Sequence, residues 1–192
     1  PVPAAAPDKP TKCPGGMVKI QKGKFVAGAK EGDRDRGFEG TARAVETRAY
    51  CIDVYEYPNR AGAQPMAGVD LAAARRLCAA QDKRLCDAAE WEKACKGPKG
   101  AAYPYGATFD PDVCVTEDRK EEGRAVSPAG SFKKCRSGYG VYDMSGNLAE
   151  WTEGGTMHGG SAQKPDYSVR CTSKARKSAD AFTGFRCCRD AQ

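Results

Sequence analysis

The sequence has very little histidine, and this limits the chemistry that it can support. His158 is the only histidine among 192 residues, and the cysteines form no C-x-x-C pair, so a zinc finger is not expected. A serine hydrolase would have only His158 as its base, and the sequence contains neither a G-x-S-x-G elbow nor a phosphate-binding glycine loop. We therefore expect His158 to be a surface imidazole in a glycine-rich loop.

Long apolar runs and blocks of like charge are also missing. No apolar run approaches the roughly 18 residues that a membrane-spanning helix needs, so no membrane span is expected. The 31 basic and 25 acidic residues give a net charge of +6 but are scattered, which argues against a nucleic-acid partner. With 40% hydrophobic and 29% charged residues, the composition is typical of a soluble globular protein of one domain.

The sequence is instead rich in cysteine. Ten cysteines, an even number, in a chain with one histidine indicate disulfides and an oxidising compartment. Residues 1–12, PVPAAAPDKPTK, are rich in proline and alanine, and we expect them to be a linker that remained when a targeting segment was removed. Residues 13–192 would form the domain, in the periplasm, secreted, or lipid-anchored outside the cytoplasm.

Two helices and several strands are predicted from the pattern of residues. One helix follows a cap at Asp70, and a second runs from a cap at Asp87, with Glu90 in the capping-box position, to Gly97. Alternation before and after a turn at Lys22 and Gly23 indicates a hairpin, and residues 45–58 have strand character. Because no further helix is predicted after Gly97, the arrangement is α+β with a loop-rich second half.

Five motifs then occur in a characteristic order. They are DKRLCDAAEWEKACKG at 82–97, YPYG at 103–106, GYGVYDMSGNLAEWTEG at 138–154, HGGS at 158–161 and GFRC at 184–187. In this order they resemble the formylglycine-generating enzyme family, also called the sulfatase-modifying factor family, over roughly residues 14–190. The resemblance implies a variant of the C-type lectin fold, α+β, with two helices, short twisted strands and many irregular loops held together by disulfides.

The resemblance also implies two of the disulfides, Cys78 to Cys187 and Cys95 to Cys171. Connectivity of the remaining cysteines does not follow from sequence. As hypotheses, we pair Cys13 with Cys51, Cys114 with Cys135, and Cys86 with Cys188.

In relatives, the G-N-x-x-E-W segment wraps a calcium ion, which prefers oxygen ligands. The resemblance implies as ligands the carbonyls of Ser145, Gly146 and Leu148, the amide or backbone oxygen of Asn147, and the carboxylate of Glu150. The alternative is that Asn147 and Glu150 satisfy buried donors of a tight turn beneath Trp151. The family's second calcium site is not expected, and the acids Asp110, Asp112, Glu117 and Asp118 are interpreted as an exposed acidic loop rather than another cation site.

Active members of the family use oxygen and a copper(I) ion, which two cysteine thiolates hold just after the GGS segment, as suits a soft cation. Here that segment reads GGSAQKPDYSVRC, and Lys164 stands about where the first thiolate would be. Cys171 matches a disulfide-bonded cysteine instead. We therefore expect no copper and no catalytic residues, and we expect Trp151, Ser161 and Lys164 to line a retained binding cleft.

Three functions remain open. The favoured one is a non-catalytic domain, a pseudoenzyme of a bacterial cell envelope, that serves as a binding or scaffold module for a protein or glycan partner. The alternative is a divergent oxidoreductase of the same family that acts on a non-sulfatase substrate. The third is a structural component of an envelope or motility complex. Fold alone does not decide between them, because one fold serves many functions.

Overall fold

The computed structural model describes residues 12–29, 39–118, 120, 122–176 and 178–191. The linker expected at residues 1–12 therefore lies outside the described residues, apart from Lys12. Within the described part of the chain, no helix is long and apolar enough to cross a membrane.

The two predicted helices are present and begin at the expected caps. Helix α1 (Leu71–Ala79) begins after Asp70, whose side chain accepts a hydrogen bond of 2.7 Å from the backbone of Ala73. Helix α2 (Ala88–Lys96) begins after Asp87, whose backbone N–H donates to the Glu90 carboxylate at 2.9 Å. It ends at Gly97, which has a positive φ of 64° that favours glycine. Local signals thus determine both helices.

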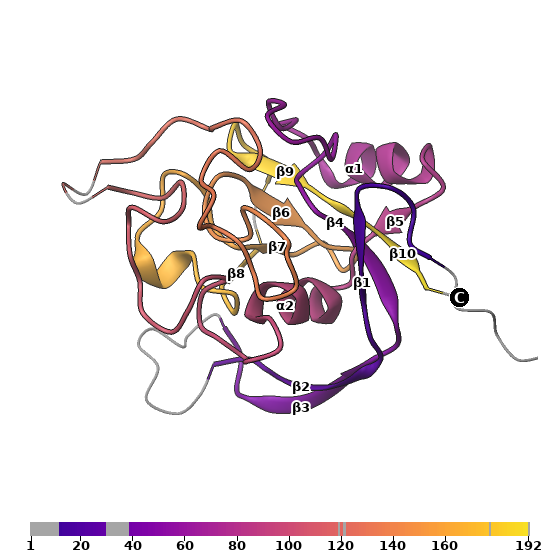
Figure 1. The fold of residues 1–192 in the computed structure, drawn as a ribbon. Coiled ribbons are helices and arrows are strands. Elements are labelled where there is room, and N and C mark those ends of the chain that lie inside the picture. Colours follow the sequence, from indigo (N-terminus) through magenta and orange to yellow (C-terminus); the bar gives the residue numbers. More distant parts are fainter. Residues whose placement is uncertain (1–11, 30–38, 119, 121, 177, 192) are drawn as a thin grey trace, which may run out of the picture.

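A four-stranded antiparallel sheet brings the start, middle and end of the chain together (Figure 1). Its order is β1 (Met17–Ile20), β4 (Tyr50–Asp53), β10 (Cys187–Asp190) and β5 (Arg84–Leu85). All four residues of β4 are buried because the strand pairs on both sides, with β1 and with β10.

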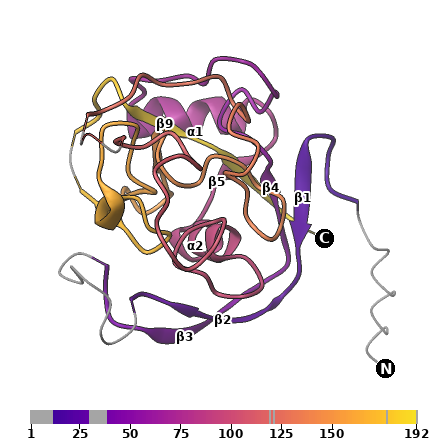
Figure 2. The ribbon, with the colours of Figure 1, turned by 60° about the vertical axis from the view of Figure 1, so that its left-hand side comes forward.

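The hairpin predicted around Lys22 and Gly23 is wrong. Strand β1 pairs with β4, whereas β2 (Gly23–Ala27) pairs with β3 (Arg43–Thr47) in a separate two-stranded sheet. The Lys93 ammonium of α2 donates to the carbonyls of Gln21 and Gly23, at 2.8 and 3.1 Å, and so holds the chain against the helix where it leaves β1. Figures 1 and 2 show the β2–β3 ribbon passing beneath α2. The strand character predicted for residues 45–58 is divided between β3 and β4, which lie in different sheets.

A second four-stranded sheet forms the other half of the fold. Its order is β8 (Lys174–Ala175), β7 (Met157–His158), β6 (Ala149–Trp151) and β9 (Thr183–Phe185), with β6 and β9 parallel. A single 3₁₀ turn, Asp166–Ser168, lies in this half, and the described residues after Gly97 contain no α-helix. The predicted α+β fold with a loop-rich second half is confirmed.

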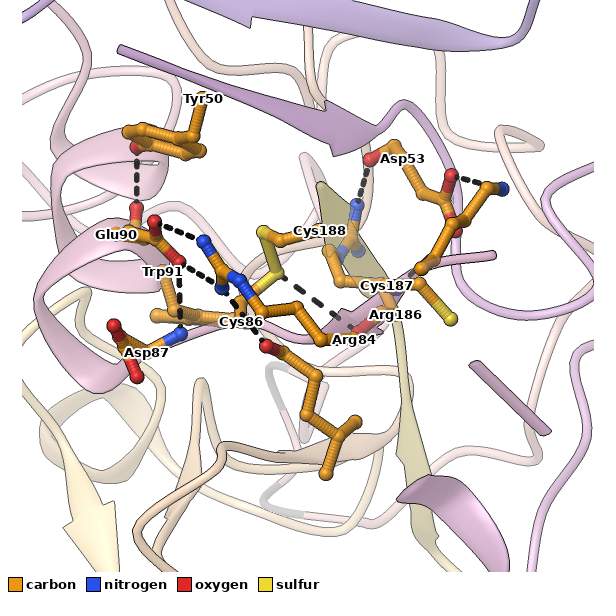
Figure 3. Close-up of a disulfide and its surroundings, with 12 residues drawn as sticks. Tyr50, Asp53, Arg84, Cys86, Asp87, Glu90, Trp91, Arg186, Cys187 and Cys188 are labelled. Atoms are coloured by element: carbon orange, nitrogen blue, oxygen red, sulfur yellow. Dashed lines mark hydrogen bonds and ion pairs between the residues drawn. A yellow bond between two sulfur atoms is a disulfide. The ribbon is translucent and has the colours of Figure 1, made fainter. Parts of the chain in front are cut away.

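Five disulfides connect these elements: the two that the resemblance implied and the three that were paired as hypotheses. They join Cys13 with Cys51, Cys78 with Cys187, Cys86 with Cys188, Cys95 with Cys171, and Cys114 with Cys135. Successive residues of a strand face opposite sides of its sheet. Cys187 therefore belongs to the core cluster that packs on α1, and Cys188 to the cluster that packs on α2. Figure 3 shows Cys188 bonded to Cys86. The neighbouring residues Cys187 and Cys188 thus link the two core clusters to strand β10.

Candidate functional site

Residues 143–151, DMSGNLAEW, lie within the motif at 138–154, and Glu150 of this segment pairs with a buried arginine. Arg186 follows β9 and is fully buried, with 0% of its surface exposed. Its Nε and Nη2 donate to the two carboxylate oxygens of Glu150 at 2.7 and 2.6 Å. Its Nη1 donates to the carbonyls of Asp53 and Val54, and Nη2 also donates to the carbonyl of Tyr142 at 2.8 Å. Figure 3 shows Arg186 reaching Asp53. Five donated hydrogen bonds satisfy the donor capacity of a guanidinium.

A third donor completes the surroundings of Glu150. The indole N–H of Trp91, on α2, donates to the same carboxylate at 2.7 Å. Glu150 therefore joins α2, β6 and the segment between β9 and β10 through one buried carboxylate. Buried charges are stable only when they are paired and hydrogen-bonded in this way.

Two further buried acids lie beside this pair. The carboxylate of Glu56 accepts hydrogen bonds from the backbone of Leu148 at 3.1 Å and from the side-chain amide of Asn147 at 2.7 Å. Burial, with the charges of Asp143 and Glu150, raises the pKa of Glu56 well above its ordinary value. Burial likewise raises the pKa of Asp143 to about 6, although its carboxylate accepts from the backbone of Gly130. One arginine thus faces three acids, two of which have raised pKa values.

The expected calcium ligands do not fit a calcium ion in this arrangement. Both oxygens of Glu150 are held by Arg186 and Trp91. The amide oxygen of Asn147 accepts from the backbone of Ser127 at 2.9 Å, and its backbone oxygen accepts from Ala162 at 3.0 Å. Among the described residues, no group of three or more His, Cys, Asp or Glu side chains is placed to hold a metal. In this structure the cation beside Glu150 is therefore the guanidinium of Arg186, and the calcium site that the resemblance implies stays a prediction.

His158 is not a surface imidazole, and that expectation is wrong. The residue lies on β7, between β6 and β8, with its ring 5.1 Å from that of Trp91, and it is buried. Burial, with the charge of Lys174, lowers its pKa to about 3. Its Nε2 lies 3.3 Å from the hydroxyl of Thr156, and within the described residues its Nδ1 has no partner. The glycines that follow it suggested a loop, but strand pairing places it in the interior.

No thiol is present. All ten cysteines are in disulfides, and Cys171 is bonded to Cys95 as expected. A disulfide sulfur has no proton to lose and so supplies no thiolate for a copper(I) ion. The residues do not fit the copper site of the active members of the family.

An open pocket of about 860 Å³ lies beside Lys164. Its lining comes from two stretches of the loop-rich half: Phe109, Pro111, Glu117 and Asp118 from the first, and Gln163, Lys164, Pro165, Asp166, Tyr167 and Ser168 from the second. Of the three expected cleft residues, Lys164 lines this pocket. Trp151 does not, because it packs in the core near α1 and its indole N–H donates to the carbonyl of Val69 at 2.8 Å. Ser161 is buried beneath the pocket-lining turn, and its carbonyl accepts from the backbone of Lys164.

Backbone hydrogen bonds hold the two stretches together. The backbone N–H of Glu117 donates to the carbonyl of Lys164 at 3.1 Å, and that of Arg124 donates to Ala162 at 2.8 Å. The side chain of Gln163 returns a bond to the carbonyl of Arg124 at 2.7 Å. The pocket is therefore built on a connected frame rather than on two independent loops.

Aromatic residues support the same frame. The hydroxyl of Tyr103 donates to the carbonyl of Asp166 at 3.2 Å, at the start of the 3₁₀ turn. The ring of Phe109 lies 5.6 Å from that of Tyr103, which is itself stacked on Tyr105. Tyr167 is 47% exposed and belongs to the pocket lining.

Sequence reasoning missed most of this pocket. It identified Lys164, and it noted the acids Glu117 and Asp118, but as part of an exposed loop. Phe109 and the turn Asp166–Ser168 carried no signal, because neither lies in a motif and the two stretches are about 50 residues apart in sequence. The backbone hydrogen bond from Glu117 to Lys164, and the bond from Arg124 to Ala162, hold them together.

Comparisons with known proteins agree with the fold. A model of the sulfatase-modifying factor enzyme 1-like domain matches residues 57–191. The inactive C-alpha-formylglycine-generating enzyme 2 of Bos taurus is 38% identical over 97 residues, which are 46% of this chain and 32% of that protein. The formylglycine-generating enzyme of Bos taurus is 27% identical over 153 residues, 59% of this chain and 40% of that protein. The matched part is thus less than half the length of either relative. The structure of PvdO from Pseudomonas aeruginosa superimposes with a TM-score of 0.76 at 19% identity, covering 91% of this chain and 94% of that one.

Proposed function

Because the chain belongs to the family of sulfatase-modifying factor enzyme 1-like domains, we propose that it is a non-catalytic member that binds a protein or glycan partner at the pocket beside Lys164. The observation that carries this proposal is that all ten cysteines are in disulfides. The active members of the family hold copper(I) with two soft thiolate ligands, and this chain offers no thiolate. The framework retains the fold of the family without the groups that hold its metal.

The pocket supports a binding role. Its volume of about 860 Å³ lies within the range of known ligand sites, and it combines aromatic rings with charged and amide groups. The similarity to a protein described as inactive supports the absence of catalysis. Five disulfides are typical of a protein that folds in an oxidising compartment, which supports a location outside the cytoplasm.

Two measurements test the proposal. In the first, the denatured protein is alkylated and its intact mass is recorded, and the native protein is incubated with copper(I), oxygen and a cysteine-containing peptide. We expect no alkylated thiol and no aldehyde product, with an active formylglycine-generating enzyme as the positive control. Aldehyde formation by the native chain would show that it is an enzyme.

The second measurement tests the pocket. Glycan and peptide arrays are probed with the wild type and with Tyr167→Ala, which removes the half-exposed ring of the pocket lining. Val26→Ala is the matched control, because Val26 is 48% exposed but lies on β2, outside the pocket lining. We expect Tyr167→Ala to lose signals that Val26→Ala keeps. Equal signals from both variants would place binding elsewhere on the molecule.

The second candidate is a divergent oxidoreductase of the same family, and the similarity to the formylglycine-generating enzyme of Bos taurus favours it. Such an enzyme would consume oxygen without thiolate-bound copper. Oxygen uptake in the presence of candidate thiol and amine substrates distinguishes it from a binding module, which consumes none.

A further inference from the structure

The pocket has a charge opposite to that of the chain. Its lining contains three acids, Glu117, Asp118 and Asp166, and one base, Lys164, a net charge of −2 (1 − 3), whereas the whole chain carries +6. Within the described part of the chain, the nearby arginine and lysine ion pairs are made with acids outside the lining, although, besides backbone hydrogen bonds, the charges of Arg124 and Lys120 also act on Asp118 and lower its pKa. Arg124 pairs with Asp112, Arg170 with Glu39, and Lys174 with Glu92.

The lining acids are held in place. The carboxylate of Asp118 accepts from the backbone N–H groups of Lys120 and Glu122, at 2.8 and 3.1 Å, and these bonds lower its pKa. Asp166 accepts from the backbone of Tyr167 at 2.7 Å. The backbone N–H of Glu117 donates to the carbonyl of Lys164, and this hydrogen bond fixes the backbone position from which the Glu117 side chain extends. Asp118 therefore stays ionised throughout the neutral range, in a set position.

Apolar surface accompanies these charges. Pro111, Pro165 and the rings of Phe109 and Tyr167 belong to the same lining. Lysine and arginine side chains pack their aliphatic stems on such surface and place their charge over aromatic faces. An anionic ligand would contact the rings but would be repelled by the two net negative charges, and a neutral polar ligand would gain no attraction from them.

We propose that the pocket binds a peptide segment of a partner protein through an arginine or lysine side chain, which packs on Tyr167 and pairs with Glu117, Asp118 and Asp166. This inference rests on the proposed function and names the ligand class for its pocket. Lys164 then repels the ligand rather than attracting it. The sign of its effect separates this proposal from one in which Lys164 captures an anion.

The test uses labelled, end-capped hexapeptides that differ only in a central pair of residues: arginine, lysine, glutamine or glutamate. Fluorescence anisotropy measures their Kd with the wild-type protein and with Glu117→Gln, Lys164→Gln and Tyr167→Ala. Glu117 suits substitution because no side-chain hydrogen bond of its carboxylate is seen among the described residues. Glu46→Gln, an exposed acid on β3, is the matched control.

We expect the arginine and lysine peptides to bind more tightly than the glutamine peptide, and this preference to weaken as salt is added. For these peptides, Glu117→Gln should raise Kd about two- to fivefold and Lys164→Gln should lower it by a similar factor, the range for an exposed charge pair. Tyr167→Ala should weaken binding, and Glu46→Gln should leave it unchanged.

Other results overturn the inference, and they bear differently on the proposed function. Tight binding of the glutamate peptide that is lost in Lys164→Gln would keep the pocket as a binding site and replace its ligand class. Glycan binding that depends on Tyr167, with no peptide binding, would likewise keep the pocket as a binding site and replace its ligand class. If peptides bind equally to every variant, or if neither peptides nor glycans bind, both the inference and the proposed pocket fail.

Discussion

The buried pair of Arg186 and Glu150 should dominate the stability of the loop-rich half. The perturbation is Arg186→Met, which keeps most of the side-chain volume and removes the guanidinium. Five hydrogen bonds are lost, and Glu150 stays buried without its cation, beside Glu56 and Asp143. Breaking a buried pair by removing one partner costs roughly 3–5 kcal/mol, so we expect a loss of that size at pH 8.

The pH dependence of the stability lost in Arg186→Met is a second test of the buried pair. The folded pKa of both Glu56 and Asp143 is already raised by burial, so each contributes stability at low pH that is lost as the pH rises through its folded pKa. Removing Arg186 raises these pKa values further, because the arginine charge lowers them in the wild type. The loss caused by Arg186→Met should therefore be smaller at pH 5 than at pH 8.

Guanidinium denaturation with the disulfides intact measures this loss. The control is Asp190→Asn, which removes the partner of Arg84 in a pair whose acid is largely exposed, and which should cost less than about 1 kcal/mol. Calcium and chelator should each leave the midpoint of the wild type and of Arg186→Met unchanged. A loss below about 1 kcal/mol for Arg186→Met, or its rescue by calcium, would refute the reasoning.

Two further predictions concern the buried histidine and the disulfides. The folded pKa of His158, about 3, lies below its usual value of 6.5, so the stability that the neutral ring contributes is present above pH 6.5 and is lost as the pH falls toward 3. As the pH is lowered from 6.5 toward 3, the stability of His158→Phe relative to the wild type should therefore rise. Parallel pH profiles of the two proteins would contradict this prediction. The Cys86–Cys188 disulfide spans 102 residues, but Cys78–Cys187 already joins the same two segments, so with that bridge intact Cys86–Cys188 closes a loop of only about 10 residues (86 − 78 and 188 − 187). Cys114–Cys135 closes a loop of 21 residues, and the loop-entropy model gives about 2.7 kcal/mol for the first bridge and about 3.3 kcal/mol for the second. Replacing each pair by serine should therefore lower the urea midpoint slightly more for Cys114–Cys135, and the opposite order would show that strain or local packing dominates.

Predictions from sequence were correct where the signal was local. The caps at Asp70 and Asp87 and the stop at Gly97 act within one turn of helix, so each helix could be predicted from its own residues. The predicted hairpin at Lys22 failed because alternation identifies a strand but not its partner, and Lys93, about 70 residues away, holds the chain between β1 and β2.

The candidate site shows the same division. The sequence drew attention to Glu150 and Lys164 through the motif and the missing thiolates, but not to the residues that surround them. Arg186 lies 36 residues from Glu150, and Phe109 lies in a stretch without a motif. The calcium site stays a prediction, because a carboxylate accepts either a metal ion or a guanidinium and its own residue type does not distinguish them; here the guanidinium of Arg186 lies against Glu150.

The sequence by itself determined the two helices, the number of cysteines and the lack of a thiolate pair after Ser161, because each is a property of composition or of neighbouring residues. The tertiary structure decided that Arg186 is the cation beside Glu150, that His158 is buried, and that an acidic pocket forms beside Lys164. These features arise from contacts between distant segments, which depend on how the two sheets and the disulfides bring those segments together.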